Sequence, residues 1–453
     1  MTFDEAVAYL DQHINLEKMI ALAGRVEGLS LDRMRGLASV LGDPQQAYPV
    51  VHLTGTNGKG STARMVSALL AAHELTVGTY TSPHLEDITE RICWNLDPID
   101  PGEFARVIGE LATLEPLVVE ELQGERPSYF ELLTAAAYAY FAEVAVDVAV
   151  VEVGLLGRFD ATNVAEADVA VVTNVAKDHT DGRGDWRRDI AQEKAGIIVP
   201  GCQLVLGEPD TELLPVFQAE APGETWLRDR DFGCVSSGLA VGGRTLDLRT
   251  PYGAYDQVFL PLHGMHQADN AACAVAAVES LFGRALDGEV MRRALTSVRL
   301  PGRFEVLHRG PLLVLDGAHN PAGARELART LDDEFSVARQ RRWVLGMLMD
   351  RDTDEMLDAL RIGMDAETED QVVACAPASP RALPADELAA YTTKRGVPTE
   401  VVPEPRDAAL RAWHAATEST QTSGEGDHAV IVTGSLYTVG DARAACRRLG
   451  LVE

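Results

Sequence analysis

A glycine-rich segment at residues 53–62, LTGTNGKGST, contains the residues of this chain best suited to binding phosphate. A β-branched run at 48–54 leads into it, and helical spacing follows from about Lys59 to His73. Successive backbone N–H groups in such a turn form an anion-binding nest, and the N-terminal end of the helix dipole adds positive potential. Lys59 supplies a point charge, and the Ser61 hydroxyl can hold Mg²⁺. The segment therefore predicts a nucleotide-phosphate site between a strand and a helix.

The glycine loop differs from the Walker A pattern G-x-x-x-x-G-K-[ST] at two positions. Leu53 stands where the pattern has its first glycine, and Gly60 separates Lys59 from Ser61. A glycine-rich turn alone is often only a tight connection, so the motif by itself leaves this simpler interpretation open. The strand before the loop and the helix after it favour phosphate binding.

Three other polar segments, 80–85 (YTSPHL), 151–163 (VEVGLLGRFDATN) and 178–180 (DHT), lie at or just beyond the ends of predicted strands. Ligands of open parallel sheets gather at the carboxyl ends of the strands. Glu152 ends an apolar strand, where burial of a carboxylate is costly unless a cation or a donor compensates it. Because Mg²⁺ prefers oxygen ligands and is commonly held by one or two carboxylates plus phosphates, Glu152 is predicted to bind it.

Taken singly, these polar residues have ordinary structural explanations. His179 would serve as a surface loop histidine, Asp178 as a helix cap and Ser82 as a turn residue. All of them fall at one predicted sheet edge, so a shared binding site is the stronger interpretation.

The elements that must position these residues alternate between strands and helices. Strands are predicted at 75–80, 146–153 and 169–173, and helices at 2–12, 31–41, 59–73, 130–142 and 264–282. Continuous apolar runs are typical of central strands in a parallel sheet, and their alternation with helices implies right-handed crossovers on both faces. Residues 225–262 instead predict a small antiparallel piece.

The strongest domain boundary lies at residues 299–303, RLPGR, where a predicted helix stops at a Pro-Gly pair before a new strand. Beyond it, strands are predicted near 312–316, 343–347, 371–375, 398–402 and 428–433. We therefore predict an α/β protein with a P-loop-type doubly wound, mainly parallel sheet domain at 1–298, a hinge at 299–303 and a smaller Rossmann-like domain at 304–453. A chain of 453 residues agrees with two domains, because one core seldom grows past about 250–300 residues.

The overall charge opposes binding to nucleic acid and to anionic membrane surfaces. The formal net charge is −29, so anionic substrates must be received by local features such as helix N-termini, a metal ion or a few arginines. The six cysteines are scattered without framework spacing, which is typical of reduced thiols. No apolar window suits a membrane span, and the acidic N-terminus does not resemble a signal peptide. The sequence predicts a cytoplasmic protein, expected to be a monomer.

Nine motifs follow one another in the order seen in the folylpolyglutamate synthase/dihydrofolate synthase family of the Mur ligase superfamily, which the chain resembles from about Tyr48 to Val439. They are TGTNGKGST, YTSPHL, VEVGLLGRFDATN, DHT, AQEKAGII (191–198), HGMHQADNA (263–271), LPGRFE (300–305), LDGAHNP (315–321) and VTGSLYTV (432–439). The resemblance implies an ATP-dependent ligase that joins L-glutamate to the carboxylate of dihydropteroate, of a reduced folate or of both.

The resemblance implies that ATP binds the loop made of Gly55, Thr56, Asn57, Gly58, Lys59, Gly60 and Ser61. It implies one Mg²⁺ near Ser61, Ser82 and Glu152, and a second near Glu152, His179 and a carbamylated Lys194. An ammonium group cannot ligate a metal, whereas a carbamate offers an anionic oxygen. From its local sequence alone, Lys194 would instead be a helix-surface lysine.

The same resemblance places Asn270 near adenine. It also places four residues of the second domain around ATP or the incoming glutamate: Arg303, Asp316, His319 and Ser435. Asp316 and His319 follow a predicted strand, although they would equally cap the helix that begins at Asn320-Pro321. The catalytic residues that the resemblance implies are Lys59, Glu152, His179, Lys194, Asp316 and His319.

Phe130 and Asp160 are implied to stack on the pterin ring and to accept its hydrogen bonds. Near them the chain departs from the family, which usually has Gly-Leu-Gly-Gly-Arg-Leu-Asp where this chain has GLLGRFD at 154–160. Leu156 replaces a glycine suited to positive φ or to close approach of the substrate. The geometry of the folate site, more than ATP binding, is therefore expected to differ.

The implied chemistry is transfer of the γ-phosphate to a carboxylate, followed by attack of the glutamate amino group, with closure of two domains at 299–303 to exclude water. A peptidoglycan Mur ligase would carry a sizeable UDP-binding domain before the glycine loop, where only about 50 residues stand here. Another Mur-type amino-acid ligase acting on a non-folate carboxylate remains an alternative. A non-catalytic nucleotide-binding module would not need Glu152, His179, Lys194 and Asp316 together.

Overall fold

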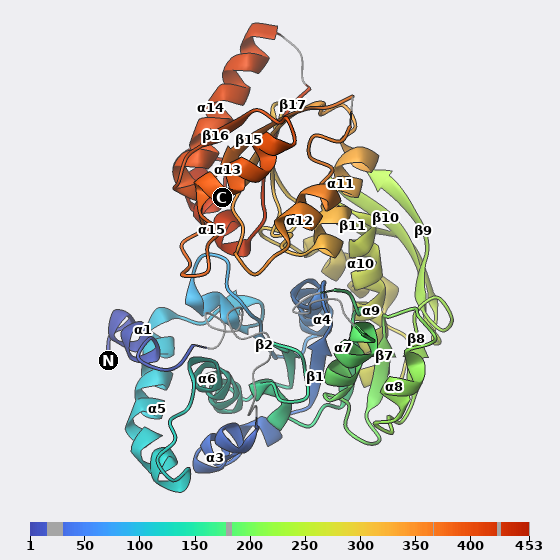
Figure 1. Cartoon of the computed structure of the whole chain (residues 1–453). Coiled ribbons are helices and arrows are strands. Elements are labelled where there is room, and N and C mark those ends of the chain that lie inside the picture. The colour runs from blue at the N-terminus through green and yellow to red at the C-terminus, as the bar shows by residue number, and fades with distance from the viewer. Residues whose placement is uncertain (16–29, 178–183, 366, 424–426, 453) are drawn as a thin grey trace. The chain divides into compact units, whose positions relative to one another are not determined.

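The computed structural model describes residues 1–15, 30–177, 184–365, 367–423 and 427–452. The chain divides into two compact units (Figure 1). The first contains Met1–Pro261 and His266–Val298, and the second contains Leu262–Met265 and Arg299–Glu453. The short segment Leu262–Met265 thus groups with the second unit before the chain returns to the first.

The first unit is built on an eight-stranded sheet with the order β4-β3-β2-β5-β1-β6-β7-β8. Its strands are β1 (Val50–Thr54), β2 (Val77–Tyr80), β3 (Ile92–Trp94), β4 (Asp97–Pro98), β5 (Val148–Glu152), β6 (Val169–Val172), β7 (Gln203–Leu206) and β8 (Thr225–Leu227). The neighbours from β2 to β8 pair in parallel, whereas β3 and β4 add an antiparallel edge. The parallel strands predicted at 75–80, 146–153 and 169–173 are present. The sequence did not predict β3 and β4, which are too short to show an alternation of apolar and polar residues.

The central strands are apolar on both faces because helices cover both. Strands β5 and β6, VAVVE and VAVV, are buried throughout. Helix α4 (Lys59–Ala72) contacts β1, β2 and β5. Helix α6 (Tyr129–Glu143) packs in one core with Ala149 and Val151, which alternate with the residues facing α4 (Figure 1). The chain therefore places the ends of β1 and β5 between two helical layers.

The other α-helices that the structure describes in this unit lie around the same sheet. They are α1 (Phe3–Leu10), α3 (Asp32–Val40), α5 (Pro101–Glu121), α7 (Trp186–Ala195), α8 (Leu214–Gln218), α9 (Met265–Phe282) and α10 (Gly288–Ser297). The capping box that opens the first predicted helix is present at Thr2 and Glu5. The sequence did not predict α5, in which Pro116 lies inside the helix and Asp100 caps its start.

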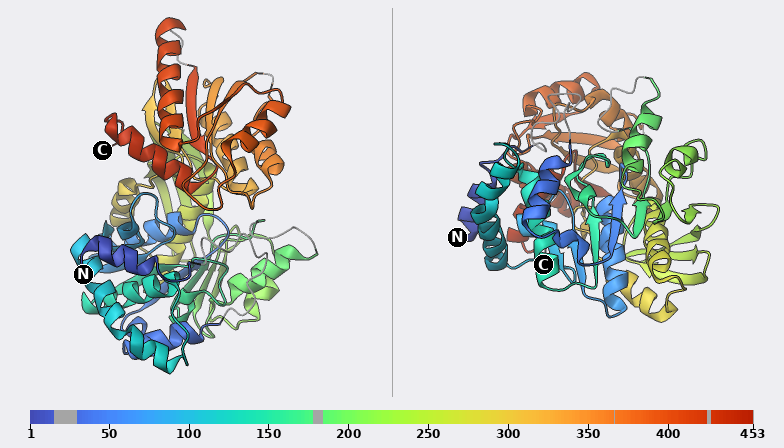
Figure 2. Two further views of the ribbon diagram at one scale, coloured as in Figure 1. Left: turned by 60° about the vertical axis from the view of Figure 1, so that its left-hand side comes forward. Right: turned by 90° about the horizontal axis from the view of Figure 1, so that it is seen from below.

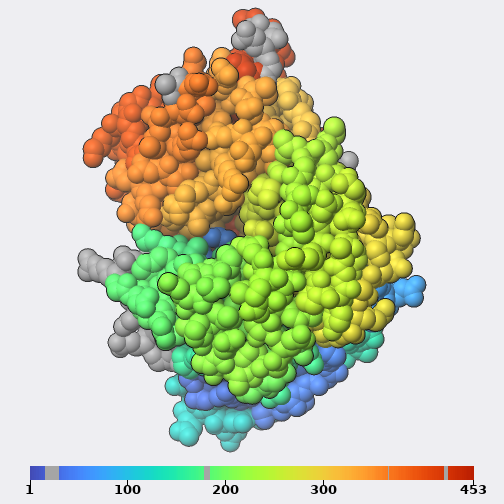
Figure 3. Space-filling model, turned by 90° about the vertical axis from the view of Figure 1, so that its right-hand side faces the viewer, coloured from blue at the N-terminus to red at the C-terminus, as the bar shows by residue number. Residues whose placement is uncertain are grey.

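A small antiparallel sheet with the order β11-β10-β9 lies beyond β8, as residues 225–262 predicted. Its strands are β9 (Gly233–Ala240), β10 (Gly243–Arg249) and β11 (Ala254–Leu260). Gly242, at φ 83°, occupies the turn between β9 and β10. Strand β11 packs against α10, and Val235 and Leu239 of the outer strand β9 are exposed. The yellow-green atoms of this part of the chain form much of the face shown in Figure 3.

The second unit contains a six-stranded sheet with the order β12-β13-β17-β14-β15-β16. Its strands are β12 (Glu305–Arg309), β13 (Leu312–Leu315), β14 (Gln340–Leu345), β15 (Glu369–Ala374), β16 (Thr399–Val401) and β17 (His428–Thr433). Strand β12 pairs antiparallel with β13, and all other pairs are parallel. Every strand predicted after residue 303 is present, although β14 begins earlier than expected because its first residues are polar.

Helices cover both faces of this second sheet (Figure 2). They are α11 (Pro321–Glu334), α12 (Thr353–Ala359), α13 (Ala385–Lys394), α14 (Pro405–Ser423) and α15 (Leu436–Arg448). Helices α11 to α13 share a core with Val314 and Trp343, whereas α14 and α15 contact β17. The predicted fold class, two α/β units with mainly parallel sheets, is confirmed. Among the described residues, no helix is both long enough and apolar enough to cross a bilayer.

Candidate active site

The glycine loop, residues 55–61, joins β1 to α4 at the carboxyl end of the first sheet. Gly55 and Gly58 adopt φ values of 149° and 82°. A Cβ on Gly55 would lie 1.8 Å from Thr173 Oγ1, and a Cβ on Gly58 would lie 2.3 Å from Asn270 Oδ1. Both positions therefore require glycine for conformation and for space. The structure places Asn270 beside the loop, and its role near adenine stays a prediction.

The Lys59 ammonium is held by the loop in which it lies. Its Nζ donates to the carbonyl oxygen of Gly55 at 3.0 Å and to that of Thr56 at 3.3 Å. Lys59 is also the first residue of α4, so the helix N-terminus and the ammonium contribute positive potential at the same place. The loop is thereby suited to receive a polyphosphate, in a chain whose net charge would repel one.

Glu152 ends β5, directly beside Leu53 of β1. Glu152 is only 4% exposed, and its Oε2 accepts a hydrogen bond from the Ser82 backbone N at 3.1 Å. A Cβ on Gly60 would lie 3.1 Å from the same Oε2. The structure therefore brings Glu152, Ser82 and the glycine loop together, as the shared sheet edge predicted.

The described residues at this edge fit a hard divalent cation. Glu152 offers a carboxylate, whereas Ser61 and Ser82 offer hydroxyl oxygens, and oxygen is the donor that Mg²⁺ prefers. Across the described ranges, no group of three or more His, Cys, Asp or Glu residues is arranged to hold a metal ion. A cation held here would thus be bound by the one described carboxylate, by the serine hydroxyls and by phosphate oxygens of a bound nucleotide. This is the usual way in which proteins bind Mg²⁺.

Lys194 lies in the last turn of α7 and is only 4% exposed, so the interpretation as a helix-surface lysine is wrong. The end of α7 packs on the segment that follows Glu152. Arg158 N donates to the Glu193 carbonyl at 2.9 Å, and a Cβ on Gly157 would lie 3.1 Å from Lys194 Cα. His179 and Asp178, also predicted at this edge, lie outside the described residues.

Two residues that the sequence did not single out hold the glycine loop from the end of β6. Asn174 accepts from the Asn57 backbone N at 3.0 Å and donates to the Asn57 carbonyl at 3.0 Å. The Thr173 hydroxyl donates to the same carbonyl at 2.6 Å. A polar pair directly after an apolar strand was the available signal, since it marks the same sheet edge as Glu152.

Substitution of Asn174 by alanine is expected to loosen this loop. The variant loses both side-chain bonds to Asn57, so we expect the KM for the nucleotide to rise about tenfold and the melting temperature to fall by a few degrees. Steady-state kinetics with varied nucleotide and a thermal melt would measure both changes. An unchanged nucleotide KM would contradict a supporting role for Asn174.

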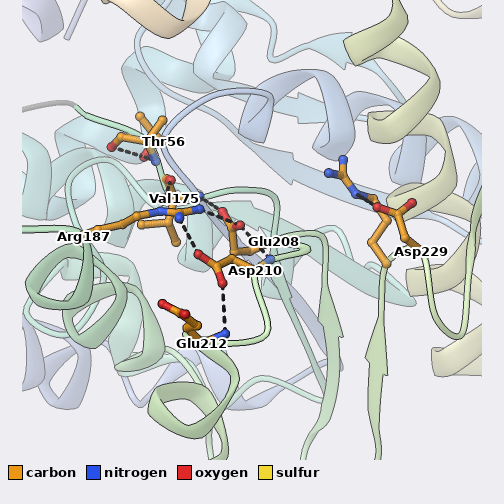
Figure 4. Close-up of polar contacts among 9 residues, drawn as sticks. Thr56, Val175, Arg187, Glu208, Asp210, Glu212 and Asp229 are labelled. Carbon is orange, nitrogen blue, oxygen red and sulfur yellow. Dashed lines mark hydrogen bonds and ion pairs between the residues drawn. The ribbon is translucent and has the colours of Figure 1, made fainter.

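A network of charged side chains continues this support behind the loop (Figure 4). Arg187 of α7 donates to Glu208 Oε1 at 2.9 Å and pairs with Asp210, while Glu208 Oε2 accepts from Val175 N at 2.8 Å. Thr56 of the glycine loop binds Ala176, the residue after Val175: its hydroxyl donates to the Ala176 carbonyl at 3.1 Å. Helix α7, the end of β6 and the glycine loop are thus joined by one chain of hydrogen bonds.

The two residues predicted at a pterin site, Phe130 of α6 and Asp160, both lie beside the start of the segment that follows β5. The Phe130 ring lies directly against Gly154, because a Cβ on that glycine would be 2.4 Å from Phe130 Cζ. Asp160 is 7% exposed, and burial raises its pKa. Its oxygens accept from Leu155 N at 2.7 Å and from Thr162 Oγ1 at 2.5 Å. Asp160 also accepts from Thr162 N at 3.0 Å, so its carboxylate organises its own loop.

Leu156, which replaces the glycine usual in the family, adopts a φ of 62°. Left-handed backbone costs a leucine roughly 1–2 kcal/mol. The conformation is fixed by the Thr54 hydroxyl, which donates to the Leu156 carbonyl at 2.8 Å. The loop therefore keeps the glycine-type backbone at this position and places a leucine side chain where the family has none.

In the second unit, four predicted residues surround one turn after β13. Asp316 accepts from Phe304 N at 2.8 Å and from Ala318 N at 2.9 Å. His319 Nδ1 lies 2.8 Å from the Gly317 carbonyl, which requires the proton on Nδ1. A Cβ on Gly317 would lie 2.6 Å from Arg303 Nη1 and 2.5 Å from Leu436, the residue after Ser435. Asn320 caps α11 before Pro321, as expected, and Ser435 caps α15.

Comparison with known proteins agrees with these two α/β units. The Mur ligase middle domain family matches residues 53–203, and the Mur ligase glutamate ligase domain family matches residues 302–436. The fold and the glycine loop thus define a Mur-type ligase, an ATP-dependent enzyme that forms a C–N bond. The dihydrofolate synthase/folylpolyglutamate synthase of Mycobacterium tuberculosis is 40% identical over 440 residues, covering 91% of this chain and 89% of that relative. The chain belongs to the dihydrofolate synthase/folylpolyglutamate synthase family.

Solved structures of the same family superpose on nearly the whole chain. Mycobacterium tuberculosis folylpolyglutamate synthase, complexed with ADP and AMPPCP, has a TM-score of 0.88 and 38% identity, covering 97% of each chain. The bifunctional folylpolyglutamate synthase/dihydrofolate synthase of Yersinia pestis, complexed with AMPPNP and Mn ion, has a TM-score of 0.79 and 30% identity, covering 99% of this chain and 98% of that one.

Proposed function

We propose that this chain uses ATP to couple a pteroate or folate carboxylate to the amino group of L-glutamate, as a dihydrofolate synthase, a folylpolyglutamate synthase or both. The observation that carries the proposal is the buried Glu152 beside the Lys59 loop, in a chain 40% identical to an enzyme of that name. The relative from Yersinia pestis was crystallised with AMPPNP and Mn, which supports a nucleotide and a divalent cation.

The triphosphate of ATP would lie on the glycine loop, with its charge met by the loop N–H groups, the start of α4 and Lys59. Ser61, Ser82 and Glu152 would hold one Mg²⁺, and Glu152, His179 and Lys194 a second. Bound Mg²⁺ neutralises charge on the phosphates during transfer. Asn270 would contact adenine, and Arg303, Asp316, His319 and Ser435 would contact ATP or glutamate.

The reaction would proceed in two steps. A substrate carboxylate oxygen attacks the γ-phosphorus of ATP, and the bond to the β–γ bridging oxygen breaks, giving an acyl phosphate and ADP. The glutamate amino group then attacks the acyl carbon, loses a proton and expels phosphate, leaving an amide. Lys59 and the loop amides stabilise charge on the transferring group, and the protein contributes positioning more than covalent chemistry.

Lys194 would act as a carbamate. The ammonium first loses a proton, and the resulting amine adds to CO₂ and loses a second proton, so a cation becomes an anion with two oxygen donors. The position of Lys194 supports this proposal: it is 4% exposed in the last turn of α7, which packs on the segment that follows Glu152, and a carbamate there could be compensated by Mg²⁺.

Phe130 would stack on the pterin, and the Asp160 carboxylate would accept hydrogen bonds from its N–H donors. The Leu156 side chain would narrow or reshape that site without affecting the ATP loop. We also propose that the enzyme is a cytoplasmic monomer whose partners are these small molecules, with neither nucleic acid nor membrane among them.

The proposal predicts that ADP release requires both an acceptor and glutamate. The assay would use dihydropteroate and tetrahydrofolate in parallel, each with and without L-glutamate, and mass spectrometry of the product. An added mass of one glutamate residue on either acceptor is the expected result. If the rate of ADP release did not depend on either acceptor, a folate substrate would be refuted and another Mur-type ligase would be favoured.

A further inference from the structure

The chain passes between the two units at three points: before Leu262, after Met265 and before Arg299. Two segments of the second unit receive these crossings, residues 262–265 and residues 299–304, and we call them the crossing segments. Hinges between units are made by a few residues of this kind, which absorb the change in backbone angles when one unit moves. The bonds that hold the crossing segments therefore decide where the chain can bend.

The first crossing segment is held by the carboxylate of Glu334, the last residue of α11. Glu334 Oε1 accepts from the backbone N of Gly264 at 2.8 Å, and its Oε2 accepts from His263 Nδ1 at 2.7 Å. The side chains of Glu334 and His263 are only 4% and 9% exposed. Bonds to a charged acceptor are strong in such a place. Gly264 has a φ of 91°, so the segment turns sharply at the bond.

The second crossing segment is held in the same manner by Glu305, the first residue of β12. Glu305 Oε2 accepts from the backbone N of Gly302 at 2.8 Å, and Gly302 has a φ of 67°. Arg443 of α15 holds this carboxylate from the other side, because its Nε donates to Oε2 at 3.0 Å and its Nη2 to Oε1 at 3.0 Å. In each crossing segment, a glycine with positive φ thus donates its N–H to a glutamate of the second unit.

Three rings join the two crossing segments to one another. The His263 ring centroid lies 5.0 Å from that of Phe335 and 5.7 Å from that of Phe304, and the two phenylalanine centroids are 5.3 Å apart. Phe304 belongs to the second crossing segment, and Phe335 directly follows Glu334. The Phe304 backbone N also donates to Asp316 Oδ2 at 2.8 Å. The anchored segments and the predicted catalytic Asp316 therefore belong to one packed body.

We propose that Glu334, together with Glu305, is a positioning residue that fixes the crossing segments so that glutamate, and not water, reaches the acyl phosphate; this rests on the proposed function. The ATP loop lies in the first unit, whereas Asp316 and its neighbours lie in the second, so the reaction needs both units in one arrangement. Attack of water on the acyl carbon would expel phosphate and return the free carboxylate, which consumes ATP without forming an amide.

The test counts ADP and amide product in the same mixture, for the full-length enzyme and for Glu334→Gln. Glutamine can accept one of the two bonds that Glu334 accepts, because its NH₂ group cannot accept the other. The wild type should form equal amounts of ADP and amide. The variant should release about two or more ADP per amide, with kcat lower by about tenfold. Its KM for ATP should stay within about twofold, since the glycine loop belongs to the first unit.

The ratio of ADP to amide does not depend on the fraction of enzyme that is folded, so a purely structural defect would leave it unchanged. His263→Phe is the second variant. It keeps a ring against Phe304 and Phe335 and removes one bond to Glu334, so it should raise the ratio as well. It carries the test if a thermal melt shows that Glu334→Gln does not fold.

Asp333→Asn is the matched control, because it makes the same kind of change at the next residue of α11, where the side chain is 55% exposed. This variant should keep the wild-type ratio and kcat. Equal amounts of ADP and amide from folded Glu334→Gln and His263→Phe would overturn the inference, as would an equal rise in Asp333→Asn. If the wild-type enzyme itself released no ADP that depends on acceptor and glutamate, the proposed function would fail instead.

Discussion

Substitution of Lys59 by alanine is expected to lower ADP formation by about 10²–10³-fold or more, the largest effect of any single change in the glycine loop. The Lys59 ammonium donates to the Gly55 and Thr56 carbonyls, and it lies at the start of α4. Alanine removes both the charge that would face the transferring phosphate and the two bonds that hold the ammonium in the loop. Coupled measurement of ADP with saturating acceptor and glutamate would show the loss.

The control for this variant is available in the chain itself. Lys394, in the last turn of α13, is exposed, so Lys394→Ala should leave turnover unchanged. Lys59→Arg keeps the charge with a different shape and should recover part of the activity. If Lys59→Ala turned over at the wild-type rate while remaining folded, the assignment of the phosphate site to this loop would be wrong.

The glycine loop could be predicted from the sequence because each of its parts is local. Gly55, Gly58 and Lys59 lie within a few residues of one another, between a strand and a helix whose patterns are visible in the chain. The supporting residues are different, since Asn174 and Thr173 reach the loop from β6. Nothing near residue 174 in the sequence shows that its side chain will bond to Asn57, because strand order decides this contact.

Burial was the other property that local patterns did not provide. The segment around Lys194 reads as a charged helix surface, yet its side chain lies inside because α7 ends against residues 157 and 158. At Leu156 the backbone conformation, rather than burial, differs from what the side chain alone would favour. The family's glycine suited either a positive φ or close approach of the substrate at this position, and the backbone has a positive φ although the residue has changed. Backbone geometry set by neighbours such as Thr54 therefore overrides the preference of a single side chain.

Substitution of Glu152 by glutamine is expected to reduce turnover about 100-fold and to raise the Mg²⁺ concentration needed for half-maximal rate by at least about tenfold. Glutamine has almost the same shape as glutamate, and its carbonyl oxygen can still accept the bond from Ser82 N that Glu152 Oε2 accepts now. The change therefore removes the negative charge and leaves the local packing intact. A titration of activity against MgCl₂ at fixed ATP would measure both effects.

The stability of the same variant separates a metal-binding role from a structural one. Glu152 is 4% exposed, and glutamine keeps its shape and can accept the same hydrogen bond from Ser82 N. If the carboxylate serves the metal, the Glu152→Gln variant should melt close to the wild-type temperature in metal-free buffer, whereas the stabilisation by added Mg²⁺ and ADP should largely disappear. The exposed carboxylate of Glu166 in the same unit provides a control, since Glu166→Gln should keep the full response. If Glu152→Gln instead melted well below the wild type and responded normally to Mg²⁺ and ADP, the carboxylate would serve the fold rather than the metal.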